Sequence, residues 1–269
     1  MTETRTQQPE TSSLQALLEL PRAGVRELSG LWALLARTLY FIARGKREEG
    51  AVVREMYSMG NRSIFFMTVT MGFIGAIIVF QTGMQAKKLV PDMSMIGPMY
   101  IKLLVRDVAA SVGAMPLATR VGAGIAAEIG SMVVTEQVDA LRMNAADPVD
   151  YLVKPKFIAS VVMGTVVLVW SGAVALLVGM VTANVMFDVN YHTFLNFNMV
   201  NTSDAVLGLV KAVTYGGAIA IVSAHQGLST HGGSEGVGWA TTRAVVGSSF
   251  AIIVLNLIIS SLGYFLLPA

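Results

Sequence analysis

The chain has 269 residues, of which 54% are hydrophobic and only 13% are charged, and its formal net charge is +2. Soluble domains usually contain about 25% charged residues, so this composition is typical of a membrane protein. A net charge so close to zero provides no basic surface for nucleic acid, and we expect no nucleic-acid partner. Because the sequence contains no cysteine, disulfides, thiolate catalysis and cysteine-based metal sites are excluded.

The first sixty residues are predicted to form two regions that do not cross the membrane. Residues 1–13 are polar, and we expect them to be disordered. In residues 14–60, apolar side chains recur at helical spacing among arginines, which predicts an amphipathic helix broken near Pro21. This segment is too charged to span, so we place it at the cytoplasmic membrane interface. A soluble helix packed on a partner is the alternative.

Four stretches contain no Asp, Glu, Lys or Arg, and each is long enough to cross a bilayer as an α-helix. They are Ser63–Ala86, Phe157–Phe187, Ala212–Ser234 and Ala244–Ala269. Residues 93–129 are also apolar, although charged side chains interrupt them, among them Lys102, Arg106, Asp107 and Arg120. We expect this segment to cross between about residues 96 and 126, because charges in a span are tolerated where they face protein or water. The predicted fold of residues 61–269 is an all-α integral membrane domain with five transmembrane helices.

The distribution of basic residues predicts how these helices are oriented. Nine of the nineteen lysines and arginines precede Ser63, so the positive-inside rule places the N-terminus in the cytoplasm. Five spans then leave the C-terminus outside, whereas four spans would return it to the cytoplasm. With five spans, Lys87 and Lys88 are expected in an external loop, which the rule disfavours without forbidding.

Small residues recur at every fourth position along the second predicted span. They are Ala110, Ala114, Ala118, Gly122, Ala126 and Gly130. Small side chains at this spacing let helix backbones approach closely, which is how helices associate in membranes. The stripe predicts a close helix partner, either within the subunit or across a subunit interface.

The most specific pattern follows this span. Glu136, Asp139 and Arg142 recur at three-residue steps, which predicts a short amphipathic helix parallel to the membrane on the cytoplasmic side. Asp147 then precedes Pro148, an N-cap followed by proline at the first helical position. This pair predicts a second short helix, which we expect to end at Pro155 before the third span.

Two long motifs resemble those of the MlaE/YrbE family of ABC-transporter permeases. The first contains Arg120-x-Gly, Ala127-Glu128-Ile129-Gly130, Thr135-Glu136-Gln137, Asp139-Ala140-Leu141, Asp147-Pro148 and Pro155. The second is Gly232-Gly233-x-Glu235-Gly236-Val237-Gly238-x-Ala240-Thr241-Thr242-Arg243-Ala244-Val245-Val246. The resemblance extends from about residue 54 to the C-terminus. Where the family has Arg-Glu-Leu-Gly-Pro, this chain has Arg106-Asp107-Val108-Ala109-Ala110, which keeps the charge pair but lacks the Gly-Pro that would break the helix.

The resemblance implies a multi-pass permease subunit of the bacterial inner membrane that moves phospholipid or another hydrophobic lipid between the membrane and an MCE-domain partner. It also implies a homodimer, with the C-terminus in the periplasm, bound to a cytoplasmic ATPase dimer. That dimer would hold ATP and Mg²⁺, so we expect this chain to have no catalytic residue and to bind no cofactor or metal. Residues 136–147 correspond to the family's coupling helix. The residues expected to couple to the ATPase are Glu128, Glu136, Asp139, Arg142 and Asp147.

The charges within the spans are candidates for a cargo path or gate. From the 1.5 Å rise per residue, the depths of Asp107 and Lys211 differ by only about 6 Å, so the two side chains can pair. Arg106 either neutralises Asp107 locally or extends to the outer interface. We expect Asp107 and Lys211 to line and gate the outer part of the path, and a purely structural ion pair is the alternative.

Two other classes of function remain open on the residues alone. An ion-coupled carrier would use Arg106, Asp107 and Lys211, because charges within a membrane are candidates for function by default. A membrane-embedded enzyme that modifies lipids would need a clustered nucleophile, base or metal site, and the polar residues show no such pattern. The sequence also contains no G-x-x-x-x-G-K-[ST] phosphate loop for ATP.

Overall fold

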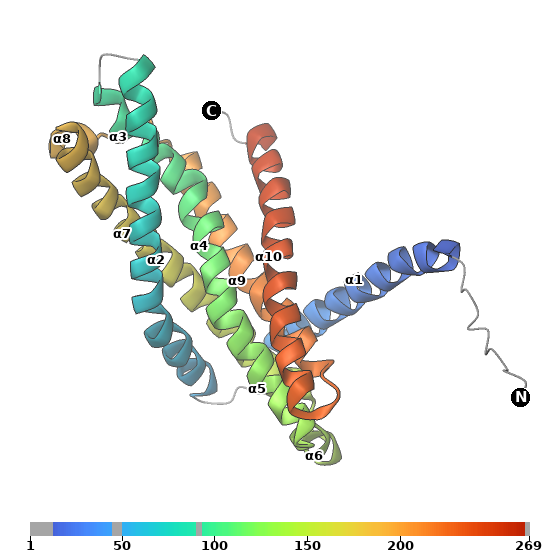
Figure 1. Cartoon of the computed structure of the whole chain (residues 1–269). Coiled ribbons are helices and arrows are strands. Elements are labelled where there is room, and N and C mark those ends of the chain that lie inside the picture. Colours follow the sequence, from blue (N-terminus) through green and yellow to red (C-terminus); the bar gives the residue numbers. More distant parts are fainter. Residues whose placement is uncertain (1–12, 45–49, 90–92, 267–269) are drawn as a thin grey trace, which may run out of the picture.

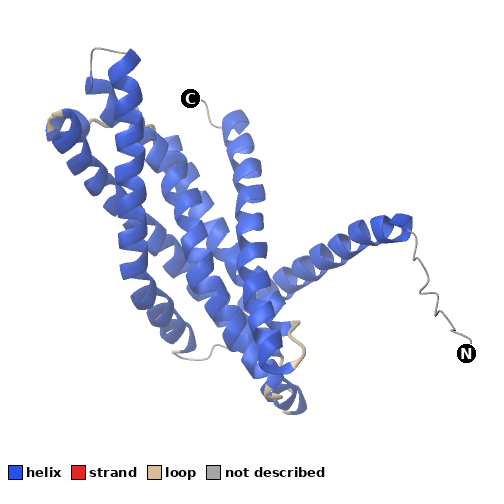
Figure 2. Ribbon diagram, viewed as in Figure 1, coloured by secondary structure: helices blue, strands red, loops and turns tan. Residues whose placement is uncertain are grey.

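The computed structural model describes residues 13–44, 50–89 and 93–266, and all regular structure in them is helical (Figure 2). Five helical stretches are long and apolar enough to cross a membrane. They are Ala51–Lys88, Ile96–Val134, Val149–Phe187, Thr202–Leu228 and Gly233–Leu266. The prediction of an all-α membrane protein is confirmed, and the charged segment after residue 93 supplies one of the five spans. The expected disorder of residues 1–13 lies outside the described residues except at Ser13, where α1 begins.

The second span is one long rod that changes its helical winding twice. It is built from α3 (Ile96–Leu103), the π-helix η2 (Leu104–Val108), α4 (Ala109–Leu117), the π-helix η3 (Ala118–Gly122) and α5 (Ala123–Val134). A 3₁₀ turn, η1 (Met93–Met95), precedes it. Single π-turns in α-helices occur frequently at functional sites. Without Gly-Pro after Asp107, the helix does not break here, but its winding widens.

The remaining helices complete a bundle in which α9 is central (Figure 1). Their bounds are α1 (Ser13–Arg44), α2 (Ala51–Leu89), α6 (Gln137–Met143), the π-helix η4 (Val149–Val153), α7 (Lys154–Phe187), α8 (Tyr191–Phe194), α9 (Thr202–Leu228) and α10 (Gly233–Leu266). Helix α2 packs along α7, while α9 packs against α7, α5 and α10. In their most apolar windows, 56% of the residues of α9 but only 11% of those of α10 are buried. Helix α9 therefore lies in the core and α10 at the periphery.

The small residues that recur along the second span lie at its close contacts with neighbouring helices. All six members of the stripe are buried: Ala110, Ala114, Ala118, Gly122, Ala126 and Gly130. A Cβ added at Gly122 would lie 2.9 Å from Ser223 Oγ of α9, and one at Gly130 would lie 2.8 Å from Thr230 Oγ1. The stripe is thus covered within one chain, which supports the first of the two alternatives for its partner.

Helix α1 differs from the expectation of a break near Pro21, because it is continuous from Ser13 to Arg44. The predicted break is wrong: proline removes one backbone donor but kinks a helix as readily as it ends one. One face of α1 packs on the bundle through Leu34 and Thr38, whereas Leu28 and Trp32 are 67% and 72% exposed. An exposed apolar face on a helix that projects sideways from the bundle suits the membrane interface (Figure 1).

Three further boundaries differ from the expected ones. Helix α2 begins at Ala51, so the expected domain boundary at residue 61 falls within it. Lys87 and Lys88 belong to the last turn of α2 and not to a loop. The short helix that begins after Asp147 does not end at Pro155. Instead η4 continues directly into α7, and Pro155 lies within this continuous helical stretch, in the first turn of α7.

An odd number of spans places the two ends of the spanning region on opposite sides of the membrane. The end of α10 lies at the same end of the bundle as α3 and α8, away from α6 (Figure 1). A reporter that is active only in the periplasm should therefore work when fused after Ala269, and a cytoplasm-only reporter should not. The same two reporters placed within the α6 segment serve as the control and should give the reverse pattern. Cytoplasmic activity at both sites would contradict five spans.

Candidate functional site

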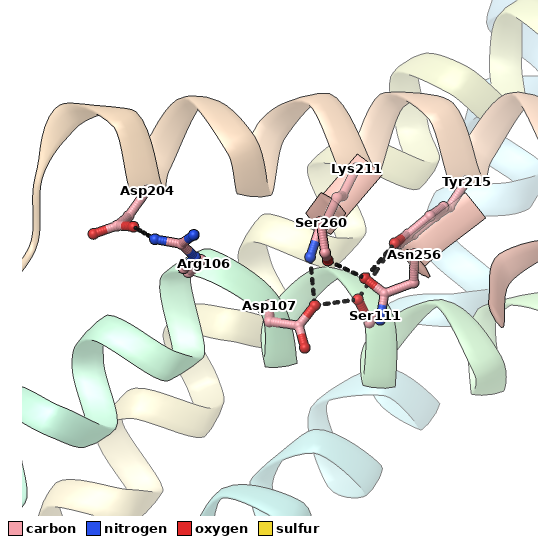
Figure 3. Close-up of polar contacts among 8 residues, drawn as sticks. All are labelled: Arg106, Asp107, Ser111, Asp204, Lys211, Tyr215, Asn256 and Ser260. Atoms are coloured by element: carbon pink, nitrogen blue, oxygen red, sulfur yellow. Dashed lines mark hydrogen bonds and ion pairs between the residues drawn. The ribbon is translucent and has the colours of Figure 1, made fainter. Parts of the chain in front are cut away.

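A buried ion pair joins the second and fourth spans in the middle of the bundle (Figure 3). Lys211 Nζ of α9 lies 2.5 Å from Asp107 Oδ1 of η2, as the depth estimate predicted. Ser111 Oγ, one turn further along, donates a second hydrogen bond to the same carboxylate at 2.8 Å. The Lys211 side chain is 1% exposed and that of Asp107 38%. The carboxylate therefore faces an opening while the ammonium group is enclosed.

Arg106 makes a separate ion pair and does not neutralise Asp107, which leaves the second of the two alternatives expected for it. Its Nη1 lies 2.8 Å from Oδ1 of Asp204, which is 2% exposed (Figure 3). Asp204 also closes the capping box of α9 by accepting from the backbone N–H of Asn201 at 3.2 Å. Asp204 lies two helical turns before Lys211, about 10 Å along α9, so the long arginine stem extends toward the outer end of the span.

A chain of hydroxyl and amide groups extends the cluster to the last span. Ser111 Oγ lies 3.4 Å from the hydroxyl of Tyr215, which donates to Asn256 Oδ1 of α10 at 3.1 Å. Ser260 donates to the same oxygen at 3.2 Å. Polar side chains that bond across helices bring α4, α9 and α10 into one network. A change at Asp107 therefore alters contacts in the second, fourth and fifth spans.

An apolar cavity of about 330 Å³ lies beside this cluster, between η2, α7 and α9. Every residue that lines it is apolar, including Val105 next to Arg106, Gly172 and Leu176 of α7, and Gly208 and Leu209 of α9. Ligand pockets usually hold about 300–1,000 Å³. The cavity has the size and lining for a hydrocarbon chain, and the charged pairs lie on the same helices.

The expected coupling residues fall into two groups at the end of the bundle that carries α6. Glu136 lies in the left-handed conformation (φ 59°) just before α6, so it is not in the helix as predicted. Asp139 and Arg142 lie in α6 and pair at 3.0 Å, with their side chains 64% and 63% exposed. Val138 anchors the helix, while Met143 is 83% exposed. This turn presents an acidic and partly apolar surface to solvent.

The other two expected coupling residues are engaged within the chain. Asp147 accepts from the backbone N–H of Val149 at 2.9 Å, which is the predicted cap, and from Arg37 of α1 at 2.7 Å. Glu128 pairs at 2.6 Å with Lys156, whose Nζ also lies 2.7 Å from Glu55. Asp147 therefore links α1 to the coupling segment, and Lys156 links α2, α5 and α7.

Sequence reasoning missed seven of these side chains. They are Glu55, Ser111, Lys156, Asp204, Tyr215, Asn256 and Ser260. The sequence contained a signal for Asp204, because Asn201-x-x-Asp204 is a capping pattern. Asp204 also lies near the start of the fourth predicted span, where a carboxylate can pair with a cation such as Arg106. Lys156 was noticeable as a charge directly before a charge-free run. The serines, Tyr215 and Asn256 carry no signal, since such residues are common in membrane helices.

These observations define a multi-pass membrane protein with charged groups paired between its spans and an exposed polar turn at one end. The family model described as Permease MlaE matches residues 52–262, and the chain belongs to this family. It is therefore an ABC transporter permease, a class that works with an ATPase partner.

Relatives extend over most of the chain. A probable ABC transporter permease protein of Synechocystis is 34% identical over 87% of this chain and 90% of its own length. A similarly named protein of Rickettsia bellii is 32% identical over 87% of this chain and 88% of its own length. The chloroplastic protein trigalactosyldiacylglycerol 1 of Arabidopsis thaliana is 30% identical over 82% of this chain and 63% of its own length.

Proposed function

We propose that this permease moves phospholipid or another hydrophobic lipid between the bacterial inner membrane and an MCE-domain partner. It acts as a homodimer on a cytoplasmic ATPase dimer that binds ATP and Mg²⁺, with its N-terminus in the cytoplasm and its C-terminus in the periplasm. The observation that carries the proposal is the apolar cavity of about 330 Å³ beside the Asp107–Lys211 pair. The Arabidopsis relative, which is named for a galactolipid, adds support.

The two parts of the site suit the two parts of a lipid. Transfer of a hydrocarbon chain from polar to apolar surroundings is favourable by about 25 cal/mol per Å² of apolar surface. The cavity lining contains only apolar residues. A phospholipid headgroup carries charge and needs polar partners, which Arg106, Asp107 and Lys211 supply on the adjacent turns. We assign these three residues to the cargo path and its gate, the pairs holding it closed until the spans move.

The ATPase acts on the opposite end through the α6 turn. Glu136, Asp139, Arg142 and Met143 are exposed there, and the turn at Thr135 and Glu136 joins α6 to the span that carries Asp107. A movement imposed on α6 is thus passed along one rod to η2. Glu128 and Asp147 contribute to coupling by fixing α5 and α1 to their neighbours and not by direct contact.

Reversing the charge of the α6 turn tests this assignment. Glu136→Lys and Asp139→Lys should each weaken association with the ATPase by about a hundredfold or more, because a like-charge juxtaposition at an interface costs several kcal/mol. ATPase recovered on the purified permease and ATP-dependent lipid transfer are the two measurements. An ion-coupled carrier or a membrane enzyme would keep its activity without the ATPase.

Asp188→Lys provides a matched control, since Asp188 is also exposed and left-handed (φ 54°) but lies at the other end of the bundle. This variant should bind the ATPase as the parent does. Normal ATPase recovery and transport in both α6 variants would refute the coupling role.

A further inference from the structure

A second cavity, of about 110 Å³, has a polar lining, unlike the first. Residues of α2, η3, α5 and the start of α7 surround it. Lys156 contributes to its lining and is held between Glu55 and Glu128 at 2.7 and 2.6 Å. Because two carboxylates surround this ammonium group, it offers no positive charge to a ligand. Any attraction for an anion must come from the other cations of the cavity.

Those cations are Arg62 of α2 and Arg120 of η3, which line the cavity from two different spans. Both are exposed, and neither makes an ion pair or hydrogen bond with another side chain in the part of the chain that the structure describes. Gly124, one turn beyond Arg120, leaves the wall open, since a Cβ added there would meet no atom within 4 Å. Two arginines without a side-chain partner therefore line a space of about 110 Å³.

The cavity lies at the boundary of the membrane. Arg62 directly precedes the charge-free run that begins at Ser63, and Phe65 and Phe66, within the next turn, are 79% and 42% exposed. Exposed apolar side chains directly after an arginine mark the point at which a helix enters the hydrocarbon of the bilayer. A group bound between Arg62 and Arg120 can thus stay attached to a hydrocarbon tail that runs along α2.

We propose that Arg62 and Arg120 bind the phosphate of an anionic phospholipid in the leaflet at the α6 end of the bundle. Guanidinium forks match phosphate oxygens and form charge-assisted hydrogen bonds with them. Basic cavities between membrane helices are suited to anionic headgroups. The site is separate from the cavity beside Asp107 and does not depend on the proposed transport of lipid.

The experiment titrates the purified full-length chain in a neutral detergent with phosphatidylglycerol and, separately, with inorganic phosphate, and follows binding by native mass spectrometry. Arg62→Gln and Arg120→Gln should each weaken phosphatidylglycerol binding by about tenfold, the effect of losing one hydrogen bond to a charged group. Arg54→Gln is the matched control, because Arg54 is an exposed arginine of the same helix outside the cavity, and it should bind as the parent does.

Two results would overturn the proposal. If the glutamine variants lose inorganic phosphate but keep the parent's affinity for phosphatidylglycerol, the site binds a soluble anion and not a lipid. If affinity for both ligands is unchanged, there is no anion site at these arginines. Arg62→Lys and Arg120→Lys, which keep the charge without the fork, should fall between the parent and the glutamine variants.

Discussion

Transport should fail when either partner of the Asp107–Lys211 pair is neutralised, and the two variants should differ in stability. Lys211 is 1% exposed and Asp107 38%. Asp107→Asn leaves an enclosed ammonium group without its counter-ion, whereas Lys211→Met leaves a carboxylate that still faces the opening and still accepts from Ser111. An unpaired charge in a span costs about 2.5–3.5 kcal/mol. We therefore expect Asp107→Asn to lower the free energy of unfolding by about that much, and Lys211→Met to lower it less.

Thermal unfolding of the purified variants and lipid transfer by the reconstituted complex measure the two effects. Lys102→Met is the control, because Lys102 lies on the same span, is half-buried and makes no ion pair among the described residues. The double change Asp107→Lys with Lys211→Asp should restore assembly whether or not it restores transport. Parent-like assembly and transport in both neutralised variants would exclude a gate and an ion pair of any importance.

The second large effect is expected at Lys156, which holds together α2, α5 and α7. Lys156→Met leaves Glu55 and Glu128 facing each other with no cation between them. Removing one partner of a buried ion pair costs about 3–5 kcal/mol. Because Glu128 remains 55% exposed and keeps part of its hydration, we expect a loss of about 2 kcal/mol here. Differential scanning fluorimetry should show a lower unfolding midpoint.

A rescue variant separates stranded charge from lost packing. Adding Glu55→Gln and Glu128→Gln to Lys156→Met removes the two unpaired carboxylates and should recover most of the stability, since replacing a whole buried pair is often neutral. Lys87 is an exposed lysine near the other end of α2, and Lys87→Met should leave the unfolding midpoint unchanged. A normal midpoint for Lys156→Met alone would mean that the three-way contact does not stabilise the bundle.

Most of the fold could be predicted from the sequence, because the hydrocarbon of a bilayer permits few backbone structures. A charge-free run such as Phe157–Phe187 has no other stable state in hydrocarbon than a helix. The second span was harder to predict, because Arg106 and Asp107 interrupt it, and its prediction depended on the tolerance for charges that face protein. The continuous helix through Pro21 was missed because a single proline does not distinguish a kink from a helix end.

The candidate site was predictable in part. Equal depth in two spans was sufficient to pair Asp107 with Lys211. It was insufficient for Arg106, whose long stem reaches Asp204 two turns away along α9. Lys156 and its two glutamates are far apart in sequence, and no local pattern shows which spans are neighbours. The small-residue stripe marked a close contact, but only the packed bundle shows that α9 and α10 cover it.

ATP-dependent transfer of a labelled phospholipid is the most direct measurement of the proposed function. The permease is reconstituted in liposomes with its ATPase subunits, and lipid movement to an MCE-domain acceptor is followed with and without ATP. We expect transfer that requires ATP hydrolysis and that Lys211→Met abolishes while Lys102→Met does not. Transfer that continues without ATP, or ATP hydrolysis that moves no lipid, would contradict a lipid-transporting ABC permease.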